Sequence, residues 1–205
     1  MSETFQPVSE ATVINMILRL GGTAKARRDY PVIAQGIARA ASNDPLFPAR
    51  TGAQATACIL VACAWTSSRL RPYVRNGNRI GLFQIRPPSF PKVSTDTLLH
   101  PGQAALIAID LIRTSVQKMA RRPWEERLAW YLDLGRVDGP IPDVPSPIAI
   151  GKSITTMRLA QRIYKGRFAE QESGTDLSNV VEYEPRALPS ARPRTRTTVS
   201  RVASP

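Results

Sequence analysis

The stretch from residue 45 to residue 95 contains no aspartate or glutamate. It therefore supplies no carboxylic acid for proton transfer. Five arginines lie between residues 69 and 86 instead. Arginine presents parallel N–H donors that match carboxylate and phosphate oxygens. The segment is suited either to hold an anionic ligand or to form a solvated basic face.

Metal-binding and nucleophilic side chains are scarce. The single His100 precedes Pro101 at an expected helix start and has no identifiable catalytic partner, which favours a structural role. Cys58 and Cys63 lie in one apolar run, where a helical separation of five gives poor disulfide geometry. One histidine and two buried cysteines do not make a zinc site. Phosphate-loop, dinucleotide and triad motifs are absent, so we expect no metal and no cofactor.

A second pattern is an ordered series of short motifs. Ser67 and Ser68 end an apolar segment, Pro72 follows, and residues 81–85 read Gly-Leu-Phe-Gln-Ile. This series resembles the soluble lytic transglycosylases and their lysozyme-like relatives, where a buried helix ends in Glu-Ser and a Gly-Leu-Met-Gln-Ile type of segment comes later. The resemblance covers about residues 51–165 and is close only at residues 81–85. Residues 128–135 resemble a later family block but lack its asparagine.

The resemblance implies a peptidoglycan-directed protein whose cleft holds glycan strands. A glycine permits close approach of a ligand, and a glutamine amide hydrogen-bonds to sugar or backbone. The residues that the resemblance places against the substrate are Ser68, Gly81, Leu82, Phe83, Gln84 and Tyr131.

The chain departs from the family at the catalytic position. Ser67 stands where the family has its general acid, or Thr66 does if the alignment shifts by one residue. Neither hydroxyl is a general acid at physiological pH. A replacement acid would have to come from elsewhere in the chain, the candidates being Asp29, Asp96, Glu125 and Glu126. We therefore predict a glycan-binding pseudoenzyme with lost or weak activity.

The apolar periodicity predicts a mainly α fold. Residues 54–67 are apolar nearly all round, which is typical of a buried central helix. A small β-hairpin or loop region is expected around residues 73–85, and residues 136–150 are expected to be a loop. The other helices are expected at about residues 10–20, 30–41, 101–119, 123–135 and 153–168. Together with the resemblance, this pattern predicts a lysozyme-like helical domain.

Composition divides the chain into three parts. We predict an N-terminal helical segment at residues 1–48, the lysozyme-like domain at 49–168, and a disordered tail at 169–205. The tail is acidic first, and its last twenty residues then carry five arginines and no acid. With a net charge of +12, this tail is suited to contact polyanions.

We expect no secretory signal, because the segment Met-Ser-Glu-Thr-Phe has neither a basic flank nor an apolar core. No apolar run is long enough to span a membrane. These features favour cytoplasmic synthesis followed by incorporation into a phage virion or by non-classical export, and the location itself stays open. Two alternatives remain: an active lytic transglycosylase using an unidentified acid, and a basic virion or nucleic-acid-associated structural protein.

Overall fold

Helices make up most of the described chain, as predicted. The computed structural model describes residues 6–20, 24–87, 93–134 and 144–168, so the expected tail of residues 169–205 and residues 136–143 of the expected loop lie outside it. The only strands within these ranges are β1 (Arg75–Asn76) and β2 (Arg79–Ile80). The helices are α1 (Glu10–Arg19), α2 (Tyr30–Asn43), α3 (Gly52–Ser68), α4 (Thr95–Leu99), α5 (Pro101–Lys118), α6 (Ala129–Asp133) and α7 (Pro147–Phe168), with 3-10 turns η1 (Ala24–Asp29) and η3 (Trp124–Glu126).

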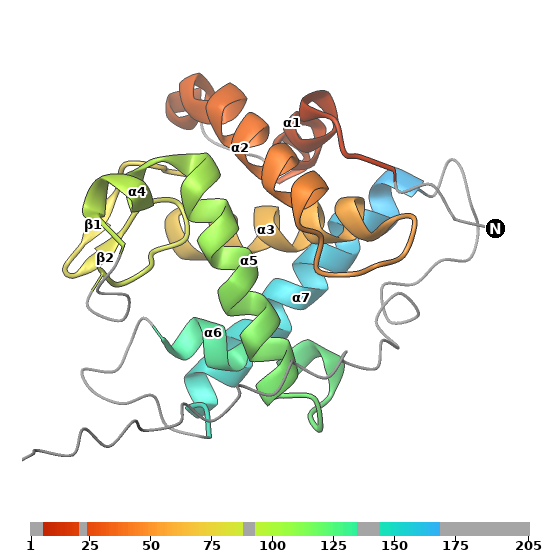
Figure 1. Ribbon diagram of the computed structural model, residues 1–205, viewed down its shortest axis with the longest axis vertical. Coiled ribbons are helices and arrows are strands. Elements are labelled where there is room, and N and C mark those ends of the chain that lie inside the picture. The colour runs from red at the N-terminus through yellow and green to blue at the C-terminus, as the bar shows by residue number, and fades with distance from the viewer. Residues whose placement is uncertain (1–5, 21–23, 88–92, 135–143, 169–205) are drawn as a thin grey trace, which may run out of the picture.

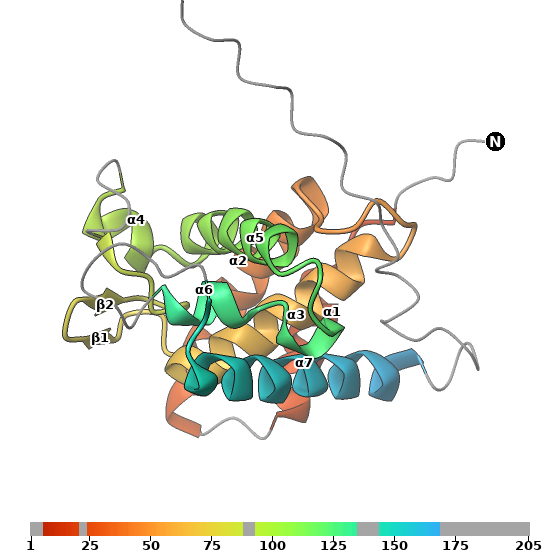
Figure 2. The ribbon, with the colours of Figure 1, turned by 90° about the horizontal axis from the view of Figure 1, so that it is seen from below.

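Helix α3 is the central element. Every residue from Gly52 to Ala64 is buried, because α1, α2, α5 and α7 all pack against it. Figure 2 shows α3 between α5 and α7. A helix that is apolar on every side is stable only when neighbours cover all of its faces. The predicted central helix is thus confirmed, and its C-terminal end is the part that emerges from the core.

Helices α2 and α5 cross at two glycines. A Cβ added to Gly36 would lie 2.7 Å from the backbone nitrogen of Gly102, which is closer than real Cβ contacts. The absence of side chains lets the two backbones approach. This contact anchors the start of α5, whose later residue Leu111 lines the cleft described below.

The hairpin expected between residues 73 and 85 is present as two short antiparallel strands. Arg75 pairs with Ile80 and Asn76 with Arg79, and Gly77 takes a φ of +61° in the turn. The hairpin and α4 lie together at one side of the helical body (Figure 1). Strand β2 and the loop that follows it form one wall of the cleft.

The sequence also predicts Ser9 and Asp29 as the N-caps of the first two helices, and the prediction is correct for Ser9 only. The Ser9 hydroxyl accepts a hydrogen bond from the Thr12 N–H at 3.2 Å and caps α1. His100 caps α5, its Nδ1 accepting from the Gln103 N–H at 3.5 Å, which confirms the structural role of this histidine. Asp29 occupies the N-cap position of α2 but makes no side-chain capping hydrogen bond there.

The continuous helix expected over residues 123–135 is wrong. The chain forms η3 and then α6, with a break between them. At this break the Ser153 hydroxyl of α7 donates to the Glu125 carbonyl at 2.6 Å and accepts from the Leu128 N–H at 3.0 Å. A side chain of α7 thus satisfies backbone groups at the break. Helix α6, which follows this break, supplies Tyr131 and Leu132 to the lining of the cleft.

Helix α7 also begins earlier than expected, at Pro147 rather than near Ser153, so the last four residues of the loop expected at 136–150 are helical. Proline suits the first turn of a helix, because its missing N–H has no intrahelical partner there. The preceding Ser146 accepts a hydrogen bond from the Ala149 N–H at 3.3 Å. The extra turns of α7 lie beside the cleft.

The described residues share one hydrophobic core, which extends from Val8 to Tyr164. Helices α1 and α2, on one side of the predicted domain boundary at residue 48, therefore pack with the helices on the other side. Cys58 and Cys63 are both buried, and no disulfide bond joins them. No described helix is both long and apolar enough to cross a membrane.

Candidate functional site

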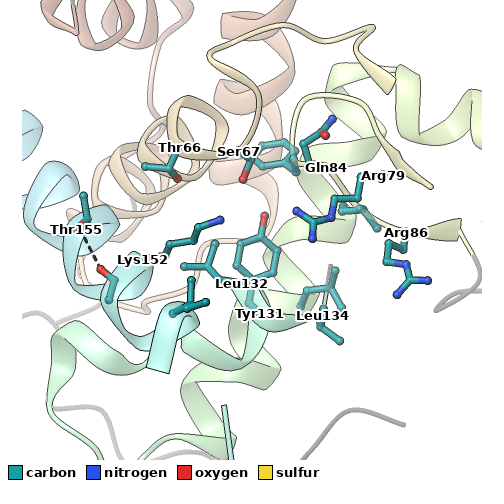
Figure 3. A pocket seen from close by; sticks show the side chains of 15 residues that line it. Thr66, Ser67, Arg79, Gln84, Arg86, Tyr131, Leu132, Leu134, Lys152 and Thr155 are labelled. Carbon is teal, nitrogen blue, oxygen red and sulfur yellow. Dashed lines mark hydrogen bonds between the residues drawn. The ribbon is translucent and has the colours of Figure 1, made fainter. Parts of the chain in front are cut away.

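A cleft of about 440 Å³ opens at the C-terminal end of α3. The loop after β2, helix α5, helix α6 and the first turns of α7 complete its walls, as Figure 3 shows. Its volume is suited to a small ligand or to one or two residues of a polymer. The lining residues are Thr66, Ser67, Arg79, Phe83, Gln84, Ile85, Arg86, Leu111, Tyr131, Leu132, Leu134, Ile148, Gly151, Lys152 and Thr155.

The two hydroxyls at the expected acid position have different surroundings. The Thr66 hydroxyl donates to the Ala62 carbonyl at 2.9 Å and accepts from Thr156 at 3.2 Å. Ser67 is half-buried, and Figure 3 shows its oxygen directed into the cleft. Ser67 is therefore the residue whose side chain a ligand in the cleft would meet.

No carboxylate of the described residues lines the cleft. The four candidate replacement acids, Asp29, Asp96, Glu125 and Glu126, all lie outside the lining. Glu126 is 3.7 Å from the Arg122 guanidinium, and Asp96 lies in the first turn of α4. Among the described residues, therefore, the lining has hydroxyls and cations but no carboxylic acid of the kind that protonates a glycosidic oxygen in the lysozyme-like mechanism.

Three residues of the predicted set, Phe83, Gln84 and Tyr131, line the cleft together with Ser67. The other three lie outside the lining. Ser68 is buried, and its hydroxyl donates to the Ala64 carbonyl at 3.1 Å and accepts from the Arg71 N–H at 3.2 Å.

The remaining two residues outside the lining are Gly81 and Leu82. Leu82 is fully buried in the core. Gly81 takes a φ of +75°, and a Cβ there would lie 2.0 Å from the Leu98 carbonyl oxygen. This glycine therefore permits a close approach of its own chain rather than of a ligand.

Gln84 is held in place by its amide nitrogen. That nitrogen donates to the carbonyls of Gly81 at 2.9 Å and Val74 at 3.3 Å. Gln84 also has a φ of +53°, an uncommon conformation for a residue with a side chain. Both donor contacts of this amide are thus made to backbone carbonyls, which fixes the position of the Gln84 side chain at the cleft wall.

Tyr131 places a polar atom in the cleft without a partner. The residue is only 5% exposed, and its phenolic oxygen makes no hydrogen bond among the described residues. Burial, with a smaller effect of the Cys63 thiol, raises the pKa of Tyr131 well above its ordinary value. The phenol is therefore neutral at physiological pH and is both a donor and an acceptor. Figure 3 shows this oxygen directed toward Ser67.

Three cations line the cleft: Arg79, Arg86 and Lys152. When its amide oxygen faces Arg86, Asn78 accepts from the guanidinium Nε at 3.2 Å and from Nη2 at 2.6 Å. This contact holds the Arg86 guanidinium in place at the cleft. Of the five arginines between residues 69 and 86, Arg79 and Arg86 line the cleft and the other three do not.

Two of the other arginines have local roles. The Arg69 guanidinium lies 5.1 Å from the centroid of the Trp65 ring, a cation–π contact. The Arg71 Nε donates to the Ser68 carbonyl at 3.0 Å. None of the three tryptophans lines the cleft, so sugar stacking on a tryptophan is not part of this site.

Sequence reasoning missed the wall formed by α7. Ile148, Gly151, Lys152 and Thr155 recur at intervals of three to four residues, the spacing of one helix face. This signal was hidden because the helix was expected to begin at Ser153. Leu111, Leu132 and Leu134 supply the apolar part of the lining and carry no sequence signal that separates them from core residues.

The described residues contain no group of three or more histidine, cysteine, aspartate or glutamate side chains that could hold a metal ion. The site as described is thus a cleft with apolar walls, the amide of Gln84, three basic side chains and four hydroxyl side chains, which are those of Thr66, Ser67, Tyr131 and Thr155. Comparisons of the chain with protein-family models, with curated proteins and with solved structures found no match.

Proposed function

We propose that this protein binds peptidoglycan glycan strands through a cleft of the lytic-transglycosylase type, with lost or weak cleaving activity. The observation that carries the proposal is the position of Ser67. It lies at the end of a buried apolar helix and faces a cleft whose described lining holds no carboxylate. The order of α3, Ser67, the hairpin and Gln84 is the order on which the resemblance to lysozyme-like proteins rests. A phage virion is the proposed context.

The chemistry of the lining supports a saccharide ligand. Phe83, Leu111 and Leu132 provide apolar walls, against which the faces of a sugar ring pack. Ser67, Gln84 and Tyr131 provide hydroxyl and amide groups that match sugar hydroxyls. A site of this kind holds a glycan without needing an acid.

Binding to purified sacculi tests the proposal directly. We expect the full chain to sediment with sacculi, and a chain ending at Tyr183 to retain at least half of that binding, because the cleft lies in residues 66–155. Unbound protein after centrifugation gives the measurement. Complete loss of binding in the shortened chain would favour the competing proposal, a basic structural protein that contacts polyanions through its arginine-rich tail.

Restoring an acid at the end of α3 tests the type of cleft. We expect Ser67→Glu to raise sacculus-clearing activity by about a hundredfold over the parent, the lower end of what a positioned general acid contributes. Cations on the cleft wall favour the ionised carboxylate and lower its pKa. Since the acid must carry its proton to act, clearing should increase as the pH falls.

The matched control is Ser67→Gln, which has the same size and no acidic proton. Turbidity of a sacculus suspension followed from pH 4.5 to pH 8 separates the two variants. Equal clearing by the glutamate and glutamine variants would argue against a cleft of this type. Strong clearing by the unchanged protein would instead point to an active enzyme with an acid elsewhere.

A further inference from the structure

Helix α7 has a basic face outside the cleft. Its sequence from Pro147 to Phe168 contains lysines and arginines but no aspartate or glutamate. Arg158, Arg162 and Lys165 are exposed, and they recur at intervals of four and three residues, the spacing of one helix face. Because a helix rises about 1.5 Å per residue, these side chains start from positions spread over about 10 Å of its axis.

Helix α1 adds a fourth cation to this face. A Cβ added to Gly166 would lie 3.0 Å from Nη1 of Arg19, so the Arg19 guanidinium lies against the C-terminal part of α7. Arg19 is also exposed. We refer to the four residues Arg19, Arg158, Arg162 and Lys165 as the α7 basic row.

The charges of the α7 basic row are not balanced by described acids. Within the described ranges, none of the four side chains makes a hydrogen bond or an ion pair. Elsewhere in the fold exposed cations do have acidic partners, as Arg113 has in Asp44 at 2.6 Å. Like charges three and four residues apart on a helix repel one another. The row is therefore kept at a cost in stability, which indicates that an external polyanion balances it.

The elements packed against α7 do not supply the missing charge. Glu10 lies in the first turn of α1, at the opposite end from Arg19. Helix α3 contains no acid. The turn η3 and helix α6 are hydrogen-bonded to Ser153 and Ser146, which both precede the row in the chain. Of the described acids on these elements, none forms an ion pair with the row.

The side chains of the row are suited to phosphate. Three of the four are arginine, whose guanidinium binds phosphate oxygens through two parallel donors. After Ile148, no large apolar side chain is exposed on the described part of α7, so this face lacks the apolar stripe with which an amphipathic helix enters a membrane surface. A fixed row of cations matches a rigid duplex, which carries one negative charge per about 1.7 Å of its axis.

We propose that the α7 basic row binds the phosphate backbone of a nucleic-acid duplex. Contacts to phosphate carry no sequence information, so this binding is not sequence-specific. Figure 2 shows α7 along one edge of the helical body, where a long rigid partner can reach it. The row begins about one turn beyond Thr155, the last residue of α7 that lines the cleft. It is therefore independent of the ligand that the cleft holds.

The test measures binding of the full chain to a short labelled DNA duplex of random sequence by fluorescence anisotropy. We expect the triple variant Arg158→Gln, Arg162→Gln, Lys165→Gln to bind about a hundredfold more weakly at about 0.1 M salt, because each lost phosphate contact removes the release of nearly one counterion. For the same reason, the slope of the logarithm of affinity against the logarithm of salt concentration should become shallower by about 2.7.

The matched control is the triple variant Arg39→Gln, Arg75→Gln, Arg121→Gln. It removes the same net charge from exposed residues on α2, on β1 and after α5. We expect it to weaken binding by less than about threefold, since screened charges act over short distances. The arginine-rich end of the chain is present in both variants, so its contribution cancels. Equal losses in the two variants would show that net charge alone binds the duplex and would overturn the proposal.

Thermal denaturation separates binding from folding. We expect the α7 triple variant to melt no earlier than the parent, because the substitutions remove repulsion between like charges. A clear drop in its melting temperature would assign the row a structural role and would argue against a docking surface.

Other occupants of the row give different outcomes. If the acidic residues 170–184 of the same chain covered it, the α7 triple variant and the parent would bind the duplex equally, which would overturn the proposal. A loss of binding to phosphatidylglycerol vesicles or to sacculi, with duplex binding unchanged, would assign the row to a membrane or to a wall polymer and would also overturn it. Loss of duplex binding with unchanged binding to sacculi supports the proposal and leaves the proposed function of the cleft standing.

Discussion

Replacing Gly81 by alanine is expected to lower the free energy of unfolding by about 3 kcal/mol. Gly81 has a φ of +75°, where a Cβ meets its own backbone, and the added carbon would lie 2.0 Å from the Leu98 carbonyl oxygen. That oxygen belongs to the backbone of α4 and cannot move aside as a flexible side chain would. The hairpin and α4 must therefore separate, which also shifts Gln84. Chemical denaturation followed by circular dichroism measures the loss.

Gly77 provides the matched control, because its φ is +61° and an added Cβ would meet nothing within 4 Å. We expect Gly77→Ala to lower the free energy of unfolding by about 1 kcal/mol, because only the positive φ disfavours the added Cβ. The difference between the two losses in free energy then measures the cost of the steric contact with the Leu98 carbonyl oxygen. Equal losses in Gly77→Ala and Gly81→Ala would contradict the close packing of the hairpin on α4.

Replacing Asp133 by alanine is expected to destabilise the protein by about 3 kcal/mol. Asp133 is 2% exposed, and its carboxylate accepts from the Ser146 N–H at 2.7 Å and from the Ser146 hydroxyl at 2.9 Å. Hydrogen bonds to a buried charge contribute more than neutral ones, and their loss leaves both Ser146 donors without this acceptor. Thermal and chemical denaturation measure the loss.

The matched control is Asp110→Ala. Asp110 also pairs with another side chain, Arg113 at 2.9 Å, but its own side chain is 73% exposed. An exposed pair of this kind is worth well under 1 kcal/mol. Ser146→Ala, combined with Asp133→Ala in a double-mutant cycle, assigns the loss to this contact. Additive effects of the two substitutions would show that Asp133 stabilises the fold in some other way.

This second contact connects stability to the cleft. Asp133 is the last residue of α6, and Ser146 precedes the first residue of α7. The neighbours of this contact, Leu132 and Leu134 on one side and Ile148 on the other, line the cleft. We therefore expect the Asp133 variant that remains folded to bind ligand more weakly, even though Asp133 itself does not line the site.

Several local features were readable from the sequence. The caps at Ser9 and His100 and the turn at Gly77 depend on residues within a few positions of one another, so their neighbours determine them. The position of α3 at the centre of the fold was predictable, because a helix that is apolar on every side is stable only when other elements pack against all of its faces. The stretch of residues 45–95 without an acid is a property of composition alone, and it holds for any fold of the chain.

Other features depend on contacts between residues far apart in the chain. The break before α6 is stabilised by the Ser153 hydroxyl, which lies 25 residues away in the chain and accepts a hydrogen bond from the Leu128 N–H. Ser68 and Gly81 were expected to contact a ligand. The Ser68 hydroxyl instead donates to a backbone carbonyl, and Gly81 instead lies against the backbone of Leu98. No local sequence pattern predicts such contacts, because a hydroxyl side chain or a glycine is equally suited to contact a ligand and to make a structural contact within the fold.

By itself, then, the sequence determined a mainly helical chain with one central apolar helix, a short hairpin and no acid where the resemblance calls for one. Only the tertiary structure decided which polar groups meet. It directs the Ser67 hydroxyl and the Tyr131 phenol into one cleft, 64 residues apart in the chain, and adds Lys152 from a helix whose start was misplaced. The physical reason is that capping and periodicity act over a few residues, whereas a cleft is formed where separate helices end against one another.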